Sequence, residues 1–434
     1  MNKKIKVIGS GPAGIFAAYT LANSGKNFEI EIIDKGGNIE ERSCSNDPSN
    51  ALHGIGGAGL KSDGKLILDR RVGNNLAEVT NSENVQRLID DVEKIFMKFG
   101  APPPKDKRGE AIGLERKALQ HGIEFVYPRQ THIGTNQLRP LMEEFQNFLE
   151  GKGVKFSCNT EIKNLDDLEY DYLILAPGRV GGGSGWMEDI LKEKNATFNY
   201  RPIDIGVRVE VPSRILGHVT DITRDMKFYI VTEKYRDMAR TFCTCPNGYV
   251  SIEVHDGFNT INGHSHSGQA TQNTNFALLV TIPLTKPLSN TNTFARNIGK
   301  TFCDLGAGKP LLQRWGDLRR HQRSKEEKQS QYNFQPTLKE VTWGDLGLAM
   351  PERYLTDIKE AMDKLNKIAP GLTNDSTLLY APEIKFHGLK INTDNYLQAV
   401  PGIYVAGDGS GISRGIVGSA ASGILAAEGI LRYS

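Results

Sequence analysis

A glycine-rich turn near the N-terminus restricts the fold of this chain more than any other feature. The turn, Gly9-Ser10-Gly11-Pro12-Ala13-Gly14, follows an apolar strand and precedes an apolar helix and a second strand that ends at Asp34. Such glycines allow a tight turn, a close backbone approach to a pyrophosphate and close helix packing, and the acid is placed for a ribose hydroxyl. We predict dinucleotide contacts at Gly9, Gly11, Pro12, Ala13, Gly14, Asp34 and Lys35, although Lys35 does not separate FAD from NAD.

Two later segments complete the same kind of domain. Residues 171–178 form an apolar strand that ends in a small-residue turn, with Ala176 and Gly178 placed close to a bound dinucleotide. Residues 404–409 form a strand that ends at Asp408, and an alanine-rich helix begins near Arg414. Both chain ends therefore build one Rossmann-like α/β domain, residues 1–195 and 381–434, with a mostly antiparallel sheet domain, residues 196–380, inserted between them.

The overall composition argues against several classes of protein. Charged residues make up 24% of the 434 residues, and a net charge of +2 is too small to indicate nucleic acid as a partner. No run approaches eighteen apolar residues, so we expect a cytoplasmic protein without a membrane span. The five scattered cysteines suit reduced thiols better than a disulfide framework.

A second glycine-rich run, residues 54–66, places Ser62, Asp63 and Lys65 beside an exposed backbone. Residues 104–124 are expected to be a polar connection. His132 precedes a helix, where it is either a flavin or substrate contact or a structural histidine.

The inserted domain contains runs of alternating residues that predict strands near 204–212, 228–231, 240–244, 249–254 and 276–282. Its basic segment, with Arg314, Arg319 and Arg320, is either a surface for an anionic substrate or a solvated face. His264 and His266 lack a third ligand, so we expect no metal there and place them at the rim of the active site.

Cys243 and Cys245 form a CxC pair on a predicted strand, where alternate residues share a face. A redox pair and two buried strand residues are both open interpretations.

Three separated segments resemble the flavoproteins with a glutathione-reductase-type FAD domain: IGSGPAG with Asp34, LILAPG, and GIYVAGDGSG with its following helix. The runs GIGGAGLKSDGKL, THIGTNQL, RPIDIGVRVEVP and RTFCTCPNGYVS further resemble a little-characterised family of FAD-dependent dehydrogenases. One departure is that Cys44 is the only cysteine before the GGAG run, which puts any redox or metal role of that segment in doubt.

The resemblance implies FAD as the cofactor and a role for several residues. The N-terminal glycines would bind the pyrophosphate, Asp34 the adenosine ribose and Asp408 the ribityl or pyrophosphate side. Amides at Gly415 and Ile416, with Arg414, would face the flavin edge that becomes negative on reduction. Gly57, Ser62, Asp63 and Lys65 would lie on the opposite side of the cofactor.

These observations predict an FAD-dependent oxidoreductase that transfers a hydride between the flavin and a polar or anionic small molecule. No second nucleotide motif is present, so either NAD(P)H binds transiently or a substrate or separate protein exchanges the electrons. The alternatives are a C=C reductase like the prenyl reductases, and a flavin redox sensor or nucleic-acid modification partner. Candidates for catalysis are His132, Lys65 and Cys243; candidates for substrate binding are Arg314, Arg319, Arg320, His264 and His266.

Overall fold

The computed structural model describes residues 2–44, 52–62, 64–178, 185–255, 257–265, 270–284, 290–332, 334–386 and 389–434. The chain divides into two compact units. Unit 1 comprises Met1–Lys105, Pro128–Arg201 and His387–Ser434, and unit 2 comprises Asp106–Tyr127 and Pro202–Phe386. Unit 1 therefore contains both ends of the chain.

Unit 1 is built on a six-stranded sheet in the order β19-β20-β7-β1-β2-β6. All neighbouring strands are parallel except the antiparallel pair β19–β20. Its strands are β1 (Lys3–Ile8), β2 (Phe28–Ile33), β6 (Lys155–Ser157), β7 (Tyr172–Leu175), β19 (Gln398–Val400) and β20 (Ile403–Val405). Two small antiparallel pairs accompany it: β3 (Lys65–Ile67) with β5 (Gln130–His132), and β8 (Phe198–Tyr200) with β18 (Leu389–Ile391).

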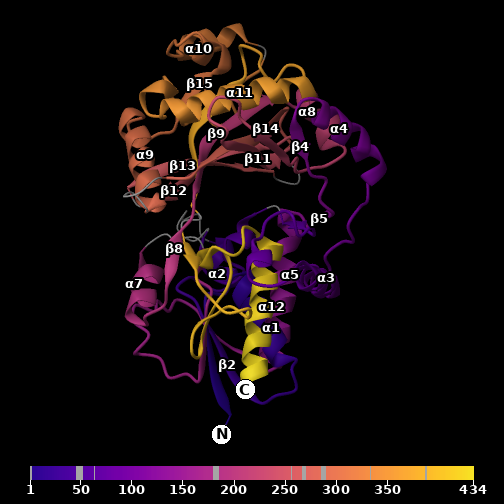
Figure 1. Ribbon diagram of the computed structural model, residues 1–434, viewed down its shortest axis with the longest axis vertical. Coiled ribbons are helices and arrows are strands. Elements are labelled where there is room, and N and C mark those ends of the chain that lie inside the picture. The colour runs from indigo at the N-terminus through magenta and orange to yellow at the C-terminus, as the bar shows by residue number, and fades with distance from the viewer. Residues whose placement is uncertain are drawn as a thin grey trace. The chain divides into compact units, whose positions relative to one another are not determined.

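The helices of unit 1 are α1 (Pro12–Ala22), α2 (Ile39–Cys44), α3 (Ser82–Lys98), α5 (Thr135–Gly151), α7 (Trp186–Glu193) and α12 (Ile416–Tyr433), with short 3₁₀ turns η2 (Gly57–Lys61), η3 (Leu76–Glu78) and η6 (Asp408–Ser410). Helices α1 and α12 lie side by side (Figure 1). A Cβ on Gly423 would lie 2.0 Å from the carbonyl oxygen of Ala13, so glycine is what allows this close packing.

Unit 2 is built on an eight-stranded sheet in the order β16-β15-β17-β9-β14-β11-β10-β4. Its strands are β4 (Ile123–Phe125), β9 (Ile203–Pro212), β10 (Phe228–Val231), β11 (Met238–Cys245), β14 (Asn273–Ile282), β15 (Leu311–Arg314), β16 (Thr342–Trp343) and β17 (Leu378–Lys385). A separate hairpin joins β12 (Tyr249–His255) to β13 (Phe258–His264). Every neighbouring pair in the large sheet is antiparallel except β15–β16.

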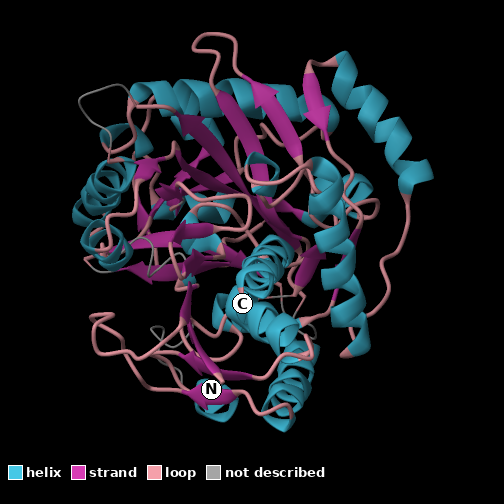
Figure 2. Cartoon of the chain, turned by 60° about the horizontal axis from the view of Figure 1, so that its bottom comes forward, coloured by secondary structure: helices cyan, strands magenta, loops and turns pink. Residues whose placement is uncertain are grey.

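The helices of unit 2 are α4 (Arg108–Gln120), α8 (Ser213–Thr220), α9 (Thr291–Leu305), α10 (Trp315–Arg319) and α11 (Glu352–Ile368), with 3₁₀ turns η4 (Glu326–Gln331) and η5 (Leu346–Leu348). Helices and strands of both units are distinguished in Figure 2. Apolar side chains of α4, α8, α9 and α11 share a core with the odd-numbered residues of β9, from Ile203 to Val211. Because side chains alternate along a strand, Asp204, Arg208 and Glu210 lie on the opposite face.

The predicted fold class is confirmed: a Rossmann-like domain is combined with a mostly antiparallel sheet. The prediction of a polar connection at residues 104–124 is wrong, because Ala111, Leu114 and Ala118 bury one side of helix α4. Strand β4 then pairs with β10, which makes residues 106–127 part of unit 2. Among the helices of the described residues, none combines the length and apolar character needed to cross a membrane.

Candidate cofactor-binding site

The turn between β1 and α1 accepts only glycine at two of its positions. A Cβ on Gly9 would lie 2.1 Å from the carbonyl oxygen of Ala176, and a Cβ on Gly14 would lie 2.0 Å from that of Gly9. Helix α1 begins at Pro12, directly after Gly11, and no side chain caps it. Its first amides and the positive end of its dipole are therefore suited to an anion such as a pyrophosphate.

The second glycine-rich turn lies directly against the first. The amide of Gly56 donates to the carbonyl of Ser10 at 2.9 Å, and a Cβ on Gly57 would lie 3.0 Å from the Cα of Gly11. A Cβ on Gly59 would meet both Pro12 and Ile416 within 3.8 Å. The turns at residues 9–14 and 54–59 and the start of α12 thus come together, although they are distant in the sequence. The glycines permit this close approach because they have no side chains.

The carboxylate of Asp34 is held entirely by donors of its own chain. Its Oδ2 accepts hydrogen bonds from the amide and hydroxyl of Ser10 at 2.8 and 2.7 Å. Its Oδ1 accepts from the amides of Gly36 and Gly54, both at 2.8 Å. The predicted ribose contact would therefore require one of these four donors to leave. The neighbouring Lys35 is exposed.

Arg42 was not among the predicted site residues, although it is 1% exposed and belongs to this site. Its guanidinium donates to the carbonyls of Gly54 at 3.4 Å, Ile55 at 2.5 Å and Gly57 at 2.9 Å. Burial lowers the pKa of Arg42 to about 10, and the nearby Asp34 opposes that shift. The side chain is therefore charged at neutral pH. The sequence contains no local signal for this role, because an arginine in a polar segment usually faces solvent.

The C-terminal segment adds a third turn to the site. A Cβ on Gly407 would lie 3.1 Å from the Cβ of Ala13, and one on Gly409 would lie 2.6 Å from the carbonyl oxygen of Gly178. Oδ1 of Asp408 accepts from the hydroxyls of Ser413 and Ser419, at 2.8 and 2.9 Å, and from the Gly415 amide at 3.2 Å. Asp408 therefore orders the entry into α12.

Helix α12 begins at Ile416 without a side-chain cap, and the preceding Gly415 is exposed. The amide of Arg414 donates to the carbonyl of Gly73 at 2.9 Å, and this bond fixes the start of α12 to the segment around Gly73. An eighteen-residue helix with an open N-terminus is suited to stabilise negative charge.

Two of the three catalytic candidates are neighbours. Lys65 on β3 and His132 on β5 stand directly opposite each other in the antiparallel pairing, so their side chains share one face. Ser62 precedes this strand, and its hydroxyl donates to the carbonyl of Gly59 at 2.6 Å. Asp63 lies outside the described residues.

The third candidate, Cys243, belongs to unit 2. Its φ of 46° and a register shift between Phe242 and Cys245 mark a bulge in β11. The expected sharing of one face by Cys243 and Cys245 assumed regular alternation, which this bulge interrupts.

The structure argues against a substrate contact by Arg314. This side chain is 1% exposed, pairs with Asp317 at 3.0 Å and lies over the rings of Tyr332 and Trp343, 5.2 Å from each ring centre. Burial of Arg314 contradicts both interpretations of the basic segment at this position, because a charged run does not reveal which of its members is buried. Arg319 and Arg320 are exposed, and Arg320 pairs with Asp375 at 2.7 Å. His264 lies at the end of β13, whereas His266 is outside the described residues.

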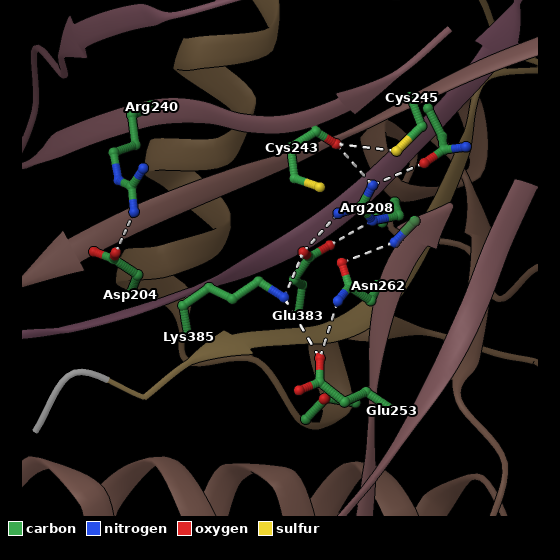
Figure 3. Close-up of polar contacts among 12 residues, drawn as sticks. Asp204, Arg208, Arg240, Cys243, Cys245, Glu253, Asn262, Glu383 and Lys385 are labelled. Carbon is green, nitrogen blue, oxygen red and sulfur yellow. Dashed lines mark hydrogen bonds and ion pairs between the residues drawn. The ribbon is translucent and has the colours of Figure 1, made fainter. Parts of the chain in front are cut away.

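The face of the unit 2 sheet opposite the apolar core carries a buried charge network (Figure 3). Arg208 forms a double hydrogen bond with Glu383, at 2.7 and 2.8 Å, and also donates to Asn275 at 2.7 Å. Lys385 adds an ion pair to Glu383 at 3.1 Å and a longer one to Glu253 at 3.8 Å. These groups therefore bind one another on this face of the sheet.

Arg240 lies on the same face, beside the network. Its Nη2 donates to Asp204 at 2.6 Å, and this is the one hydrogen bond that its side chain makes within the described part of the chain. The guanidinium lies 4.8 Å from the ring centre of Phe242, and Tyr229 stands opposite Arg240 on β10. The Arg240 side chain is 11% exposed, and its guanidinium has further N–H donors besides the one bonded to Asp204.

Two parts of this chain match models of known protein families. Residues 202–385 match a family model described as "FAD-dependent protein, C-terminal domain-like", and residues 7–64 match a model of an NAD(P)-binding Rossmann-like domain. A relative from Clostridium beijerinckii, described as an uncharacterized protein, is 25% identical over 476 residues and covers 98% of this chain and 80% of the relative.

Similar solved structures include glycine oxidase from Bacillus cereus, with a TM-score of 0.41 and 13% identity over 100% of this chain and 96% of that one. L-proline dehydrogenase from P. horikoshii has a TM-score of 0.41 and 12% identity over 100% and 94% of the two chains. At such TM-scores these likenesses assign no substrate.

The glycine-lined turns fit a dinucleotide pyrophosphate, and the matched domain of unit 2 is of the FAD-dependent kind. The chain is an FAD-dependent oxidoreductase.

Proposed function

We propose that this protein transfers a hydride between FAD, bound in a domain of the glutathione-reductase type, and a small anionic substrate. The observation that carries the substrate class is Arg240, a cation with one hydrogen bond to Asp204 and an aromatic neighbour, Phe242. A guanidinium with remaining donors binds a carboxylate or phosphate in a planar, two-pronged geometry.

The proposed roles in unit 1 follow from its turns. Amides of the Gly9–Gly14 and Gly57–Gly59 segments bind the pyrophosphate, and the open N-terminus of α12 at Gly415 and Ile416 stabilises negative charge on the reduced flavin ring. The flavin supplies the hydride chemistry. Lys65 and His132, on one face of the β3–β5 pair, are the proposed proton-handling groups.

The C=C reductase alternative is less well supported. A prenyl substrate requires a long apolar surface, whereas the unit 2 sheet carries Arg240, Tyr229 and the buried charge network on the face opposite its apolar core. A polar substrate matches these groups, because its hydrogen bonds to the charged side chains offset the free-energy cost of removing those side chains from water.

The test is anaerobic reduction of the flavin by candidate substrates. The loss of the flavin's visible absorbance measures the rate of reduction. We expect one of a panel of amino acids and hydroxy acids to bleach the flavin rapidly, and its carboxamide analogue to do so at least about tenfold more slowly. Arg240→Gln should remove this discrimination, whereas Arg353→Gln, an exposed arginine of α11, should retain it.

Equal rates for the acid and its amide would contradict the anionic substrate. Bleaching by NADH or NADPH alone would assign the reductive half-reaction to a nicotinamide donor. Bleaching by dithionite alone would instead favour the sensor function.

A further inference from the structure

We infer that Asp34 and Arg42 act as positioning residues that join the two glycine-rich turns into one preformed pyrophosphate-binding surface, and that Asp34 does not bind the ribose of FAD. This inference rests on FAD as the cofactor and is independent of the substrate proposed above.

The first argument is the hydrogen-bond capacity of the Asp34 carboxylate. A carboxylate offers about four acceptor positions. Four donors already occupy them in this chain, all at 2.7 or 2.8 Å: two from Ser10 and one each from Gly36 and Gly54. A ribose hydroxyl would therefore have to displace an existing donor and leave it unpaired, which costs more than the new bond returns if that donor is buried.

The second argument is that two opposite charges bind the same turn. Asp34 accepts from the amide of Gly54, while Arg42 donates to the carbonyls of Gly54, Ile55 and Gly57. The backbone of this turn is therefore held at both its donor and its acceptor groups. A guanidinium can bond several carbonyls at once because its donors form a fixed planar fork.

The third argument is the direct contact of this turn with the first one. Through Ser10, Asp34 also holds the Gly9–Gly14 turn, and Gly56 donates to the carbonyl of Ser10. Gly57 then packs on Gly11, at the start of α1. Asp34 and Arg42 thus hold in place the two backbone segments whose amides would contact the pyrophosphate.

The experiment compares how tightly full-length apoprotein binds FAD and two FAD analogues that lack the 2′- or the 3′-hydroxyl of the adenosine ribose, by quenching of flavin fluorescence. We expect Asp34→Asn to weaken all three ligands by the same factor, on the order of tenfold, because an amide nitrogen cannot accept the bonds of two donors. We expect Arg42→Lys to weaken all three equally as well, since an ammonium lacks the planar fork.

Glu40→Gln is the matched control: it removes an exposed charge from α2, two residues from Arg42, and should leave all three affinities unchanged. Circular dichroism of each apoprotein verifies folding. If Asp34→Asn does not fold, Ser10→Ala removes one of the four donors and should weaken the three ligands equally, by about fivefold.

Two outcomes would overturn the inference. A penalty of Asp34→Asn that disappears with either deoxy analogue would show that Asp34 binds that hydroxyl. Unchanged FAD affinity in both Asp34→Asn and Arg42→Lys would show that these side chains do not position the turns.

Discussion

Unit 1 builds its site from backbone groups, whereas unit 2 presents charged side chains on one face of a sheet. In unit 1, glycines bring the turns at residues 9–14 and 54–59 into contact, and charged groups such as Asp34 and Arg42 hold the backbone in place. In unit 2, Arg208, Glu383 and Lys385 are buried and bind one another. A cofactor that is common to many enzymes can be bound by amides, whereas a particular substrate requires particular side chains.

The largest expected effect lies in the buried network of unit 2. Arg208→Met should lower the free energy of unfolding by about 3–5 kcal/mol, because it removes the main partner of a carboxylate that is fully buried. Arg129→Met, which breaks an exposed pair with Glu93 in unit 1, should cost about 1 kcal/mol or less. Urea unfolding of the two variants measures both losses in the free energy of unfolding. Equal losses would contradict the distinction between the buried network of unit 2 and the exposed pair of unit 1.

The second largest effect is expected in the glycine-rich turn between β1 and α1 of unit 1. Gly14→Ala places a methyl group 2.0 Å from the carbonyl oxygen of Gly9, so we expect a loss of about 1–3 kcal/mol in stability together with the loss of bound flavin. Gly113→Ala in α4 meets no atom within 4 Å and should retain the flavin with unchanged or slightly raised stability. Thermal unfolding and the visible spectrum report both quantities. Retention of flavin by Gly14→Ala would show that the turn tolerates a Cβ.

The smallest effect concerns a carboxylate on the helix-covered side of unit 2. Burial, followed by its neighbour Asp237, raises the pKa of Asp357 from 3.8 to about 6. Because the folded state binds this proton more tightly than the unfolded state, protonation stabilises the fold as pH falls from about 6 toward 4, and this contribution is lost as pH rises through 6. Asp357→Asn should therefore raise the Tm at pH 8 by on the order of 2–4 °C, and by less at pH 4.5.

Asp363 of the same helix is a suitable control because it is exposed. Asp363→Asn should leave the pH dependence of the Tm unchanged. An Asp357→Asn protein whose Tm gain is the same at pH 4.5 and pH 8 would show that Asp357 does not titrate in this range.

The parts of the site that could be predicted are those whose physical cause is local in the sequence. The spacing of Gly9, Gly11 and Gly14 after an apolar strand is itself the condition for the turn, and the turn has the predicted position. Alternation along residues 204–212 predicts strand β9, observed at Ile203–Pro212, because side-chain direction in a strand depends on local alternation alone.

The roles of charged residues could not be predicted in the same way. Arg42 and Arg314 both occur in polar segments, yet both are buried, and their partners are known only once the chain has folded. Lys65 and His132 are 67 positions apart in the sequence, and the pairing of β3 with β5 makes them neighbours.

The sequence by itself determined the glycine turn of the dinucleotide-binding unit and the alternating strands of the other sheet, because strand alternation and glycine turns are encoded over a few residues. Only the tertiary structure decided that the Asp34 carboxylate is filled by four donors of its own chain and that Arg42 holds the opposing turn. The reason is that the energy of a charged group depends on every donor, acceptor and water-excluding atom around it, and in a folded chain most of these come from distant positions.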